Sequence, residues 1–125
     1  MGEVIFTDRE LDIMAVLWER GPSTVTEVRD RLADRLAYTT VLTILRTLEG
    51  KRHVGHEEEG RAHRYHARVE RDEAQVSALR RLTRKLFSGS TELLLTHLVS
   101  DRDLAEKDLQ RMRELLDGRL EGGDG

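Results

Sequence analysis

The chain of 125 residues contains no cysteine and few aromatic residues. Without cysteine it can form no disulfide, no thiolate metal site and no cysteine nucleophile, and such an absence is typical of a cytosolic protein. Only 4% of the residues are aromatic, so the core must be built mainly from leucine, valine and isoleucine. Apolar residues reach 38% and charged residues 36%, which predicts a modest core beneath a heavily charged surface.

Long hydrophobic runs are also missing. No apolar stretch approaches the roughly 20 residues that a membrane-spanning helix needs, so no membrane partner is expected. Residues 1–4 show no basic segment followed by an apolar run, which predicts that there is no signal peptide. A cytoplasmic location is the resulting expectation.

Negative charge exceeds positive charge by 3, which taken alone argues against binding to nucleic acid. The location of the charge matters more than the total. Residues 35–68 contain seven lysines and arginines against four glutamates, a local excess of +3, whereas the other segments are acidic or balanced. The basic excess therefore lies in one short region.

Two capping boxes mark the starts of two helices. The first is Thr7–Glu10, a hydroxyl N-cap with glutamate three residues later, and apolar residues then recur at helical spacing as far as Trp18. The Gly-Pro pair at residues 21–22 is expected to end this helix. The second box is Thr24–Glu27, which predicts another helix that ends near Asp34.

A third helix is predicted over residues 38–50. The i, i+3, i+4, i+7 spacing of one helix face is followed by Val41, Ile44, Leu45 and Leu48. The opposite face holds Thr39, Thr43, Arg46 and Thr47. Because threonine is only a middling helix former, so many threonines in this helix need another reason. That reason is contact with DNA bases, since arginine forks onto guanine and threonine offers a methyl group and a hydroxyl. An ordinary solvated helix face is the alternative. The residues predicted to contact bases are Thr39, Thr40, Thr43, Arg46 and Thr47.

A β-hairpin follows the third helix. Residues 53–57 and 63–66 flank a turn at residues 58–61, where Gly60 can take a positive φ. Three helices and a hairpin with little linker between them predict a winged helix-turn-helix domain over residues 1–70. In such a domain the third helix enters the major groove and the hairpin reaches the phosphate backbone. A generic small α+β domain is the alternative.

Four cations near the end of the third helix and in the hairpin are candidates for contacts with DNA phosphates. They are Lys51, Arg52, Arg61 and Arg64. Plain surface charge is the alternative for each of them. The three glutamates Glu57–Glu59 would repel phosphate, so the wing is expected to touch the backbone only through Arg61.

Neither a metal site nor an active site is expected, and no cofactor. The histidines at positions 53 and 56, and those at 63 and 66, are spaced i, i+3, which points the two side chains of a pair to opposite faces of a strand. A metal held by histidines from both strands of the hairpin is the alternative. The serines lack the context of a nucleophile elbow, and no glycine-rich loop could cradle a phosphate. The chain is therefore expected not to be an enzyme.

Residues 71–125 are predicted to form a helical dimerisation domain. Helices are expected over residues 72–88, 92–99 and 104–120, with residues 121–125 as a frayed tail. The middle helix is apolar around most of its circumference and needs burial on several sides, which the helices of one chain offer poorly. A monomeric helical cap is the alternative. The residues expected at the dimer interface are Leu86, Phe87, Leu93, Leu94, Leu95, Leu98, Val99, Leu109, Met112 and Leu116.

Five stretches of the chain form an ordered set. They are LDIMAVLWERGP (11–22), AYTTVLTILRTL (37–48), GRAHRY (60–65), LFSGSTELLLTHLV (86–99) and LAEKDLQRMRELL (104–116). Together they resemble the penicillinase-repressor family (BlaI/MecI type) of winged-helix transcriptional regulators. The resemblance implies an intertwined homodimer on an inverted-repeat operator. It also implies, for some members, that repression ends when a sensor protease cuts the C-terminal domain.

The chain departs from the family pattern at several positions. The bond that the sensor protease cuts in the family joins an Asn-Phe pair, and the matching positions here are His97 and Leu98, which puts proteolytic release in doubt. Copper-responsive relatives use a C-terminal cysteine cluster, and the lack of cysteine excludes that mechanism. Ala37 stands at the N-cap of the third helix, where a hydroxyl would cap better by about 1 kcal/mol. His63 replaces an aromatic residue often found in the wing.

These patterns together predict a DNA-binding transcriptional repressor that binds an inverted-repeat operator as a homodimer. Two other functions stay open. A winged-helix module that binds protein would suit the net negative charge and the glutamates of the wing. An effector-binding winged-helix regulator would hold a small molecule between its two domains, although the chain shows no pocket signature.

Overall fold

The computed structural model describes residues 4–122, which form six helices and three strands. The chain divides into two compact units, residues 1–79 and 80–125. A mainly helical chain with one small antiparallel sheet confirms the predicted fold class, a winged helix followed by a helical C-terminal region. None of the helices within residues 4–122 has the length and apolar character that crossing a membrane would require.

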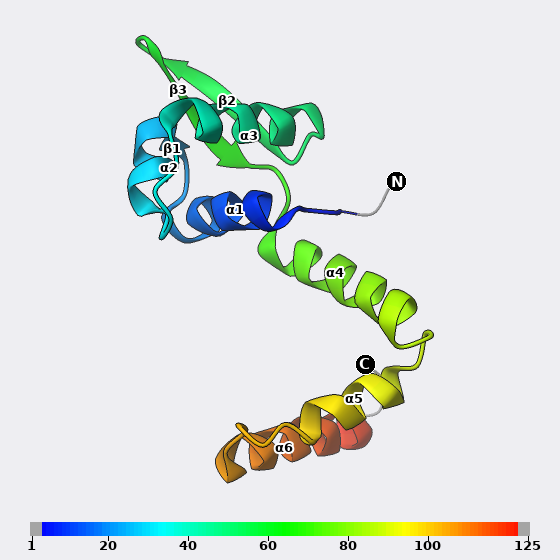
Figure 1. Ribbon diagram of the computed structural model, residues 1–125. Helices are drawn as coiled ribbons and strands as arrows, with labels where there is room; N and C mark the ends of the chain where they lie inside the picture. The colour runs from blue at the N-terminus through cyan, green and yellow to red at the C-terminus, as the bar shows by residue number, and fades with distance from the viewer. Residues whose placement is uncertain (1–3, 123–125) are drawn as a thin grey trace. The chain divides into compact units, whose positions relative to one another are not determined.

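The first unit contains the winged helix (Figure 1). The order of its elements along the chain is that of the prediction, with one additional short strand. The turn between the last two strands projects past the helices as the wing (Figure 1). The elements are α1 (Asp8–Arg20), β1 (Ser23–Thr24), α2 (Val25–Arg31), α3 (Tyr38–Gly50), β2 (Val54–Glu59) and β3 (Ala62–Ala67).

Both predicted capping boxes are present. The Thr7 hydroxyl accepts a hydrogen bond from the backbone N–H of Glu10 at 3.1 Å, and the Glu10 carboxylate accepts one from the N–H of Thr7 at 2.8 Å. Thr24 and Glu27 make the same reciprocal pair at the start of α2. Each box satisfies two backbone donors that a helix start would otherwise leave unpaired.

Helix α2 is shorter than predicted. It ends at Arg31 instead of near Asp34, because Leu32 leaves the helix with an extended backbone and a ψ of 141°. In that conformation Leu32 packs against the core.

The sheet has the strand order β1-β3-β2, and both pairings are antiparallel. Tyr65 of the central strand lies opposite Ser23 on one side and opposite His56 on the other. Gly60 and Arg61 form the turn of the hairpin, and Gly60 takes a positive φ of 62°, as predicted. Strand β1 was not predicted, because two residues are too few to show a periodic pattern.

The core of the first unit is built from aliphatic residues with Met14 and Tyr65. This composition agrees with the expectation from the low aromatic content. Trp18 packs at the edge of the core, where its indole N–H donates to the carbonyl of Val69 at 2.8 Å and its ring meets Phe6 edge-on. The buried residues are Ile13, Met14, Val16, Leu17, Val25, Val28, Val41, Leu45, Leu48, Val54 and Tyr65.

Helix α3 has the predicted bounds. Val41, Leu45 and Leu48 have no exposed surface, whereas the threonines on the other face are exposed. Ala37 at the N-cap makes no side-chain hydrogen bond, as expected for a residue without a hydroxyl. The helix is therefore held from its apolar side.

The remaining helices are α4 (Arg71–Leu86), α5 (Thr91–Val99) and α6 (Glu106–Gly122). Helix α4 begins in the first unit and ends in the second, whereas the sequence places the domain boundary where this helix starts. Ser88 and Gly89 take positive φ values of 50° and 79°, which end α4 earlier than predicted.

The last helix differs from the prediction at both ends. It begins at Glu106, because the Asp108 carboxylate accepts a hydrogen bond from the N–H of Ala105 and fixes the start there. The predicted frayed tail of residues 121–125 is helical as far as Gly122, and its last three residues lie outside the described residues.

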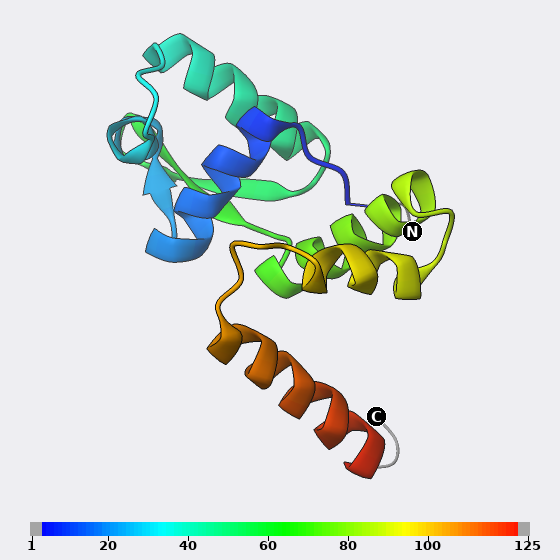
Figure 2. The ribbon, with the colours of Figure 1, turned by 60° about the horizontal axis from the view of Figure 1, so that its bottom comes forward.

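The second unit buries little of its apolar surface. Among residues 80–122, Leu94 is the only buried side chain. Figure 2 shows α6 extending away from α5. Large apolar side chains on all three helices are consequently exposed in the single chain. They are Leu82, Leu86, Leu93, Leu98, Val99, Leu109, Leu115, Leu116 and Leu120.

A serine at the N-cap of α3 should stabilise the first unit. Ala37→Ser supplies an acceptor for the N–H of Thr40, the bond that Thr7 and Thr24 already provide in α1 and α2. We expect the free energy of unfolding to rise by about 1 kcal/mol, measured by urea unfolding followed by circular dichroism. Ala33→Ser, in the exposed loop before α3, is the control and should have no effect. Equal urea midpoints for Ala37→Ser and the wild type would contradict the prediction.

Candidate nucleic-acid interface

The outer face of α3 is polar and exposed. Seen along the helix axis, the five residues predicted to contact bases fall within an arc of about 120°. All five side chains are exposed, so the fold gathers them on one accessible surface. They are Thr39, Thr40, Thr43, Arg46 and Thr47.

Two threonines of this face use their hydroxyl hydrogens within the helix. Thr43 Oγ1 donates to the Thr39 carbonyl at 2.9 Å, and Thr47 Oγ1 donates to the Thr43 carbonyl at 3.0 Å. Such bonds to the carbonyl four residues earlier fix the side-chain rotamer. The methyl groups and the oxygen lone pairs stay available, so these two positions can offer apolar contacts and hydrogen-bond acceptors, while Arg46 offers donors.

Side chains of the hairpin contact the C-terminal half of α3. The Glu49 carboxylate and His56 Nδ1 lie 2.5 Å apart, and the His56 ring stacks on His63 with 4.2 Å between centroids and 8° between planes. Burial raises the pKa of Tyr65, Glu49 adds to this effect, and Arg46, which approaches the hydroxyl, opposes it. Polar and aromatic contacts thus join the helix to the wing beside the exposed face.

Lys51 directly follows α3 and binds the buried Glu10 of α1. Its Nζ lies 2.9 and 3.0 Å from the two carboxylate oxygens, and Glu10 is only 3% exposed. Burial alone would raise the pKa of Glu10, but hydrogen bonds from Thr7 and Lys51 outweigh burial and hold the pKa below its ordinary value. Lys51, a predicted phosphate contact, therefore has an intramolecular partner that ties α3 to α1.

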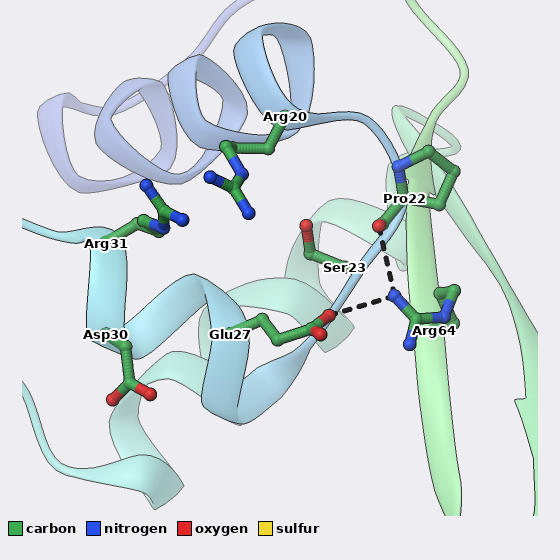
Figure 3. Close-up of a pocket in the computed structure, with 7 residues that line it drawn as sticks. All are labelled: Arg20, Pro22, Ser23, Glu27, Asp30, Arg31 and Arg64. Atoms are coloured by element: carbon green, nitrogen blue, oxygen red, sulfur yellow. Dashed lines mark hydrogen bonds and ion pairs between the residues drawn. The ribbon is translucent and has the colours of Figure 1, made fainter.

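Arg64 of β3 is engaged in a similar way (Figure 3). Its guanidinium donates to both carboxylate oxygens of Glu59, at 2.7 and 3.0 Å. It also donates to Glu27 at 2.9 Å and to the Pro22 carbonyl at 3.2 Å. The hydrogen bonds to Glu59 and Glu27 raise the pKa of Arg64 above its ordinary value. Arg64 thereby links the wing to the start of α2.

Arg52 and Arg61 differ from the other two predicted phosphate contacts. Both are exposed, and neither side chain forms a hydrogen bond or an ion pair with any residue in the described part of the chain. Arg61 lies in the turn of the wing. Arg52 has a positive φ of 68° at the end of α3, where glycine is usual because a side chain in this conformation costs about 1 kcal/mol.

The Arg64 network borders a polar hollow (Figure 3). Side chains of Arg20 and Arg31 point into it from α1 and α2. The hollow belongs to the first unit, so it is not the pocket between two domains that the effector-binding alternative expects. Its lining residues are Arg20, Pro22, Ser23, Glu27, Asp30, Arg31 and Arg64.

Three of the four histidines in residues 53–66 make ring contacts. His53 meets the Phe6 ring edge-on at 5.0 Å, and burial, reinforced by Lys51, lowers its pKa. His56 and His63 come from neighbouring strands and stack on each other. Within residues 4–122, no cluster of three or more histidine, aspartate or glutamate side chains is arranged so that it could bind a metal ion.

Similarity to known proteins identifies the class of this protein. Residues 6–118 match the profile of a family described as penicillinase repressor. The chain belongs to the penicillinase repressor family. Similar proteins are the transcriptional regulators named BlaI from Mycobacterium tuberculosis strains CDC 1551 / Oshkosh and ATCC 25618 / H37Rv. Each is 38% identical over 122 residues, which cover 94% of this chain and 86% of the relative. The resemblance stated from the sequence is confirmed, and the protein is a transcriptional repressor and not an enzyme.

Sequence reasoning about this repressor missed the partners of Lys51 and Arg64. Both cations bind the N3 glutamate of a capping box, Glu10 in α1 and Glu27 in α2. Each of these glutamates therefore caps a helix and also binds a cation from a later element. The capping boxes were a visible signal for the glutamates, but no sequence pattern indicates which cation each one binds.

The stability of the repressor should fall in acid through Glu10. Because its pKa is lower in the folded than in the unfolded chain, its contribution is complete above the ordinary value of 4.5 and is lost as the pH falls through the folded pKa. Glu10→Gln should thus be less stable than the wild type at pH 7, and the difference should shrink below about pH 4.5. Urea unfolding at several pH values measures this.

Glu57→Gln, a change at an exposed glutamate of the wing, is the matched control and should leave the acid profile unchanged. A difference between Glu10→Gln and the wild type that stays constant with pH would mean that the Glu10 charge does not stabilise the fold.

Proposed function

We propose that this repressor binds double-stranded operator DNA as a homodimer, with α3 in the major groove and the wing over the phosphate backbone. One observation carries the proposal. Val41, Leu45 and Leu48 on the apolar side of α3 have no exposed surface, while the threonines and Arg46 opposite them are exposed. Such a helix fits the major groove, where base edges present donors, acceptors and methyl groups. No cofactor is assigned, and the proposed location is the cytoplasm.

The exposed side chains have two roles in this proposal. Arg46 forks onto guanine O6 and N7, and the threonines of the same face offer methyl contacts and acceptors to other bases. Arg52 and Arg61 contact phosphates, which carry no sequence information but set the position of the protein. Lys51 and Arg64 hold the helix and the wing in place through their ion pairs. They contact phosphate only through N–H donors that are not bonded to these carboxylates.

In this proposal, residues 1–70 form the DNA-binding domain and residues 71–125 form the dimerisation domain. A second copy of the chain covers the exposed apolar surface of the dimerisation domain. So many exposed leucines on three helices are unfavourable in water and mark an association surface. Of the predicted interface residues, Leu94 is buried within its own chain, and Phe87, Leu95 and Met112 are partly buried. The others are exposed, namely Leu86, Leu93, Leu98, Val99, Leu109 and Leu116.

Release by a sensor protease is not part of the proposal. His97 and Leu98 occupy the positions that the resemblance gives to the cleaved pair of the family, and neither residue type matches that pair. The His97 ring also packs against Phe87 with 5.5 Å between centroids.

Arg46→Ala tests the role of α3. With a probe from the DNA directly upstream of its own gene, we expect binding to weaken by about 1–3 kcal/mol and the preference over random DNA to decrease, because a base contact is lost. Arg61→Ala should instead weaken binding to both DNAs alike and lower the slope of log K against log salt by about 0.9. Fluorescence anisotropy at several salt concentrations measures both effects.

Arg111→Ala, an exposed position on α6, is the control for the loss of one positive charge and should bind like the wild type. Wild-type affinity and preference in Arg46→Ala would refute the assignment of α3 as the reading helix, and a sequence-selective loss in Arg61→Ala would refute a phosphate contact.

Leu98→Asp tests the dimer. The side chain is 49% exposed in the single chain, so the chain should still fold, but a charge at an apolar interface costs several kcal/mol. We expect the dimer dissociation constant to rise at least about 100-fold, measured by analytical ultracentrifugation. Thr96→Asp introduces the same charge at an exposed polar position of α5 and should leave the dimer intact. Equal dissociation constants for the two variants would argue against a dimer through this surface.

A further inference from the structure

The densest positive charge of the chain lies on α4, outside the winged helix. Residues 74–91 contain four cations, Arg80, Arg81, Arg84 and Lys85, and no aspartate or glutamate. In residues 35–68, by contrast, four glutamates offset seven cations. Two of those cations, Lys51 and Arg64, are also bound to carboxylates within the fold. The cations of α4 therefore need an explanation of their own.

The four cations share one side of the helix, named here the basic face of α4. At 100° per residue they fall within an arc of about 140°, whereas Leu82 and Leu86 lie on the opposite side. If a second copy of the chain covers the leucines, the basic face is the side of this helix that stays accessible. All four side chains are exposed in the single chain.

Three of the four cations on the basic face, Arg80, Arg81 and Lys85, form no ion pair with any residue between 4 and 122. Arg80 and Arg84, and likewise Arg81 and Lys85, are like-charge pairs at the i, i+4 spacing, which destabilise a helix unless an anion lies between them. The helix dipole favours the two cations of the last turn, but its effect does not extend to Arg80 and Arg81.

We propose that the basic face of α4 is a second phosphate-binding surface, which contacts the backbone of double-stranded DNA. The inference rests on the proposed DNA binding of this repressor and adds a surface outside the winged helix. Evenly placed cations without an apolar anchor match a uniform polyanion, whereas an acidic protein partner would need apolar or aromatic contacts at the centre of its interface. The contacts are independent of base sequence, because phosphates carry no sequence information.

The test compares the full-length wild type with the triple variant Arg80→Gln, Arg81→Gln, Lys85→Gln. The probe is a labelled random-sequence duplex several helical turns long, bound at salt concentrations between about 50 and 200 mM. Each lost phosphate contact should make the slope of log K against log salt shallower by about 0.9, so we expect a change of about 2 or more and at least about tenfold weaker binding at low salt.

The matched control is Arg102→Gln, Lys107→Gln, Arg111→Gln, which removes the same charge from exposed positions elsewhere in the second unit and should keep the wild-type slope. Circular dichroism and sedimentation must show that both variants keep the fold and the oligomeric state of the wild type. An equal slope for the α4 variant and the wild type would overturn the inference and leave the proposed function standing.

Two further outcomes separate the alternatives. A wild type that binds no duplex at any salt concentration would remove the proposed function, and this inference with it. The α4 variant could instead lose the binding to polyglutamate that the wild type shows, while its slope of log K against log salt on DNA stays unchanged. That result would overturn the inference in favour of an acidic protein partner.

Discussion

The exposed face of α3 can bind a partner only if the helix is held in place through its other side. In the first unit, the buried side and the ends of α3 provide this support. Val41, Leu45 and Leu48 are completely buried beneath the helix. Lys51 fixes the end of the helix to the buried carboxylate of Glu10. Contacts from the hairpin hold the C-terminal half, and Thr43 and Thr47 of the outer face bond to the helix backbone. The outer face is therefore ordered before a partner binds, which reduces the entropy lost on binding.

Ion pairing within the fold decides which cations remain for an anionic partner. A protein with a net charge of −3 gains little from its total charge when it approaches DNA. Glu10 and Glu27 use their carboxylates to cap helices and to bind one cation each, so the charges of Lys51 and Arg64 are partly neutralised within the fold. In the account proposed here, Arg52 and Arg61, together with Arg80, Arg81 and Lys85 of α4, keep their charge for contacts outside the chain. Affinity then comes from the placement of these cations and selectivity comes from the outer face of α3.

The limits of prediction from the sequence follow from the range of the interactions. The bounds of α3, both capping boxes and the turn at Gly60 could be predicted, because each pattern acts over a few neighbouring residues. The ion pairs of Lys51 with Glu10 and of Arg64 with Glu27 could not, because these partners lie 41 and 37 positions apart and only tertiary folding brings them together. The basic face of α4 escapes notice when charge is summed over long segments, since the acidic residues on both sides cancel it. In the second unit the leucine pattern predicts helices, but it does not say what covers the leucines, and one chain alone leaves them exposed.

The central claim is that the outer face of α3 and the wing form the DNA-binding surface of this repressor. A titration of the isotope-labelled full-length protein with duplex DNA from the region upstream of its own gene, followed by amide chemical shifts, tests this claim directly. The account predicts that the largest shift changes fall on α3, with a second group at Arg61 and its neighbours in the turn. Changes confined to α5 and α6, with the amides of α3 unaffected at saturation, would contradict it.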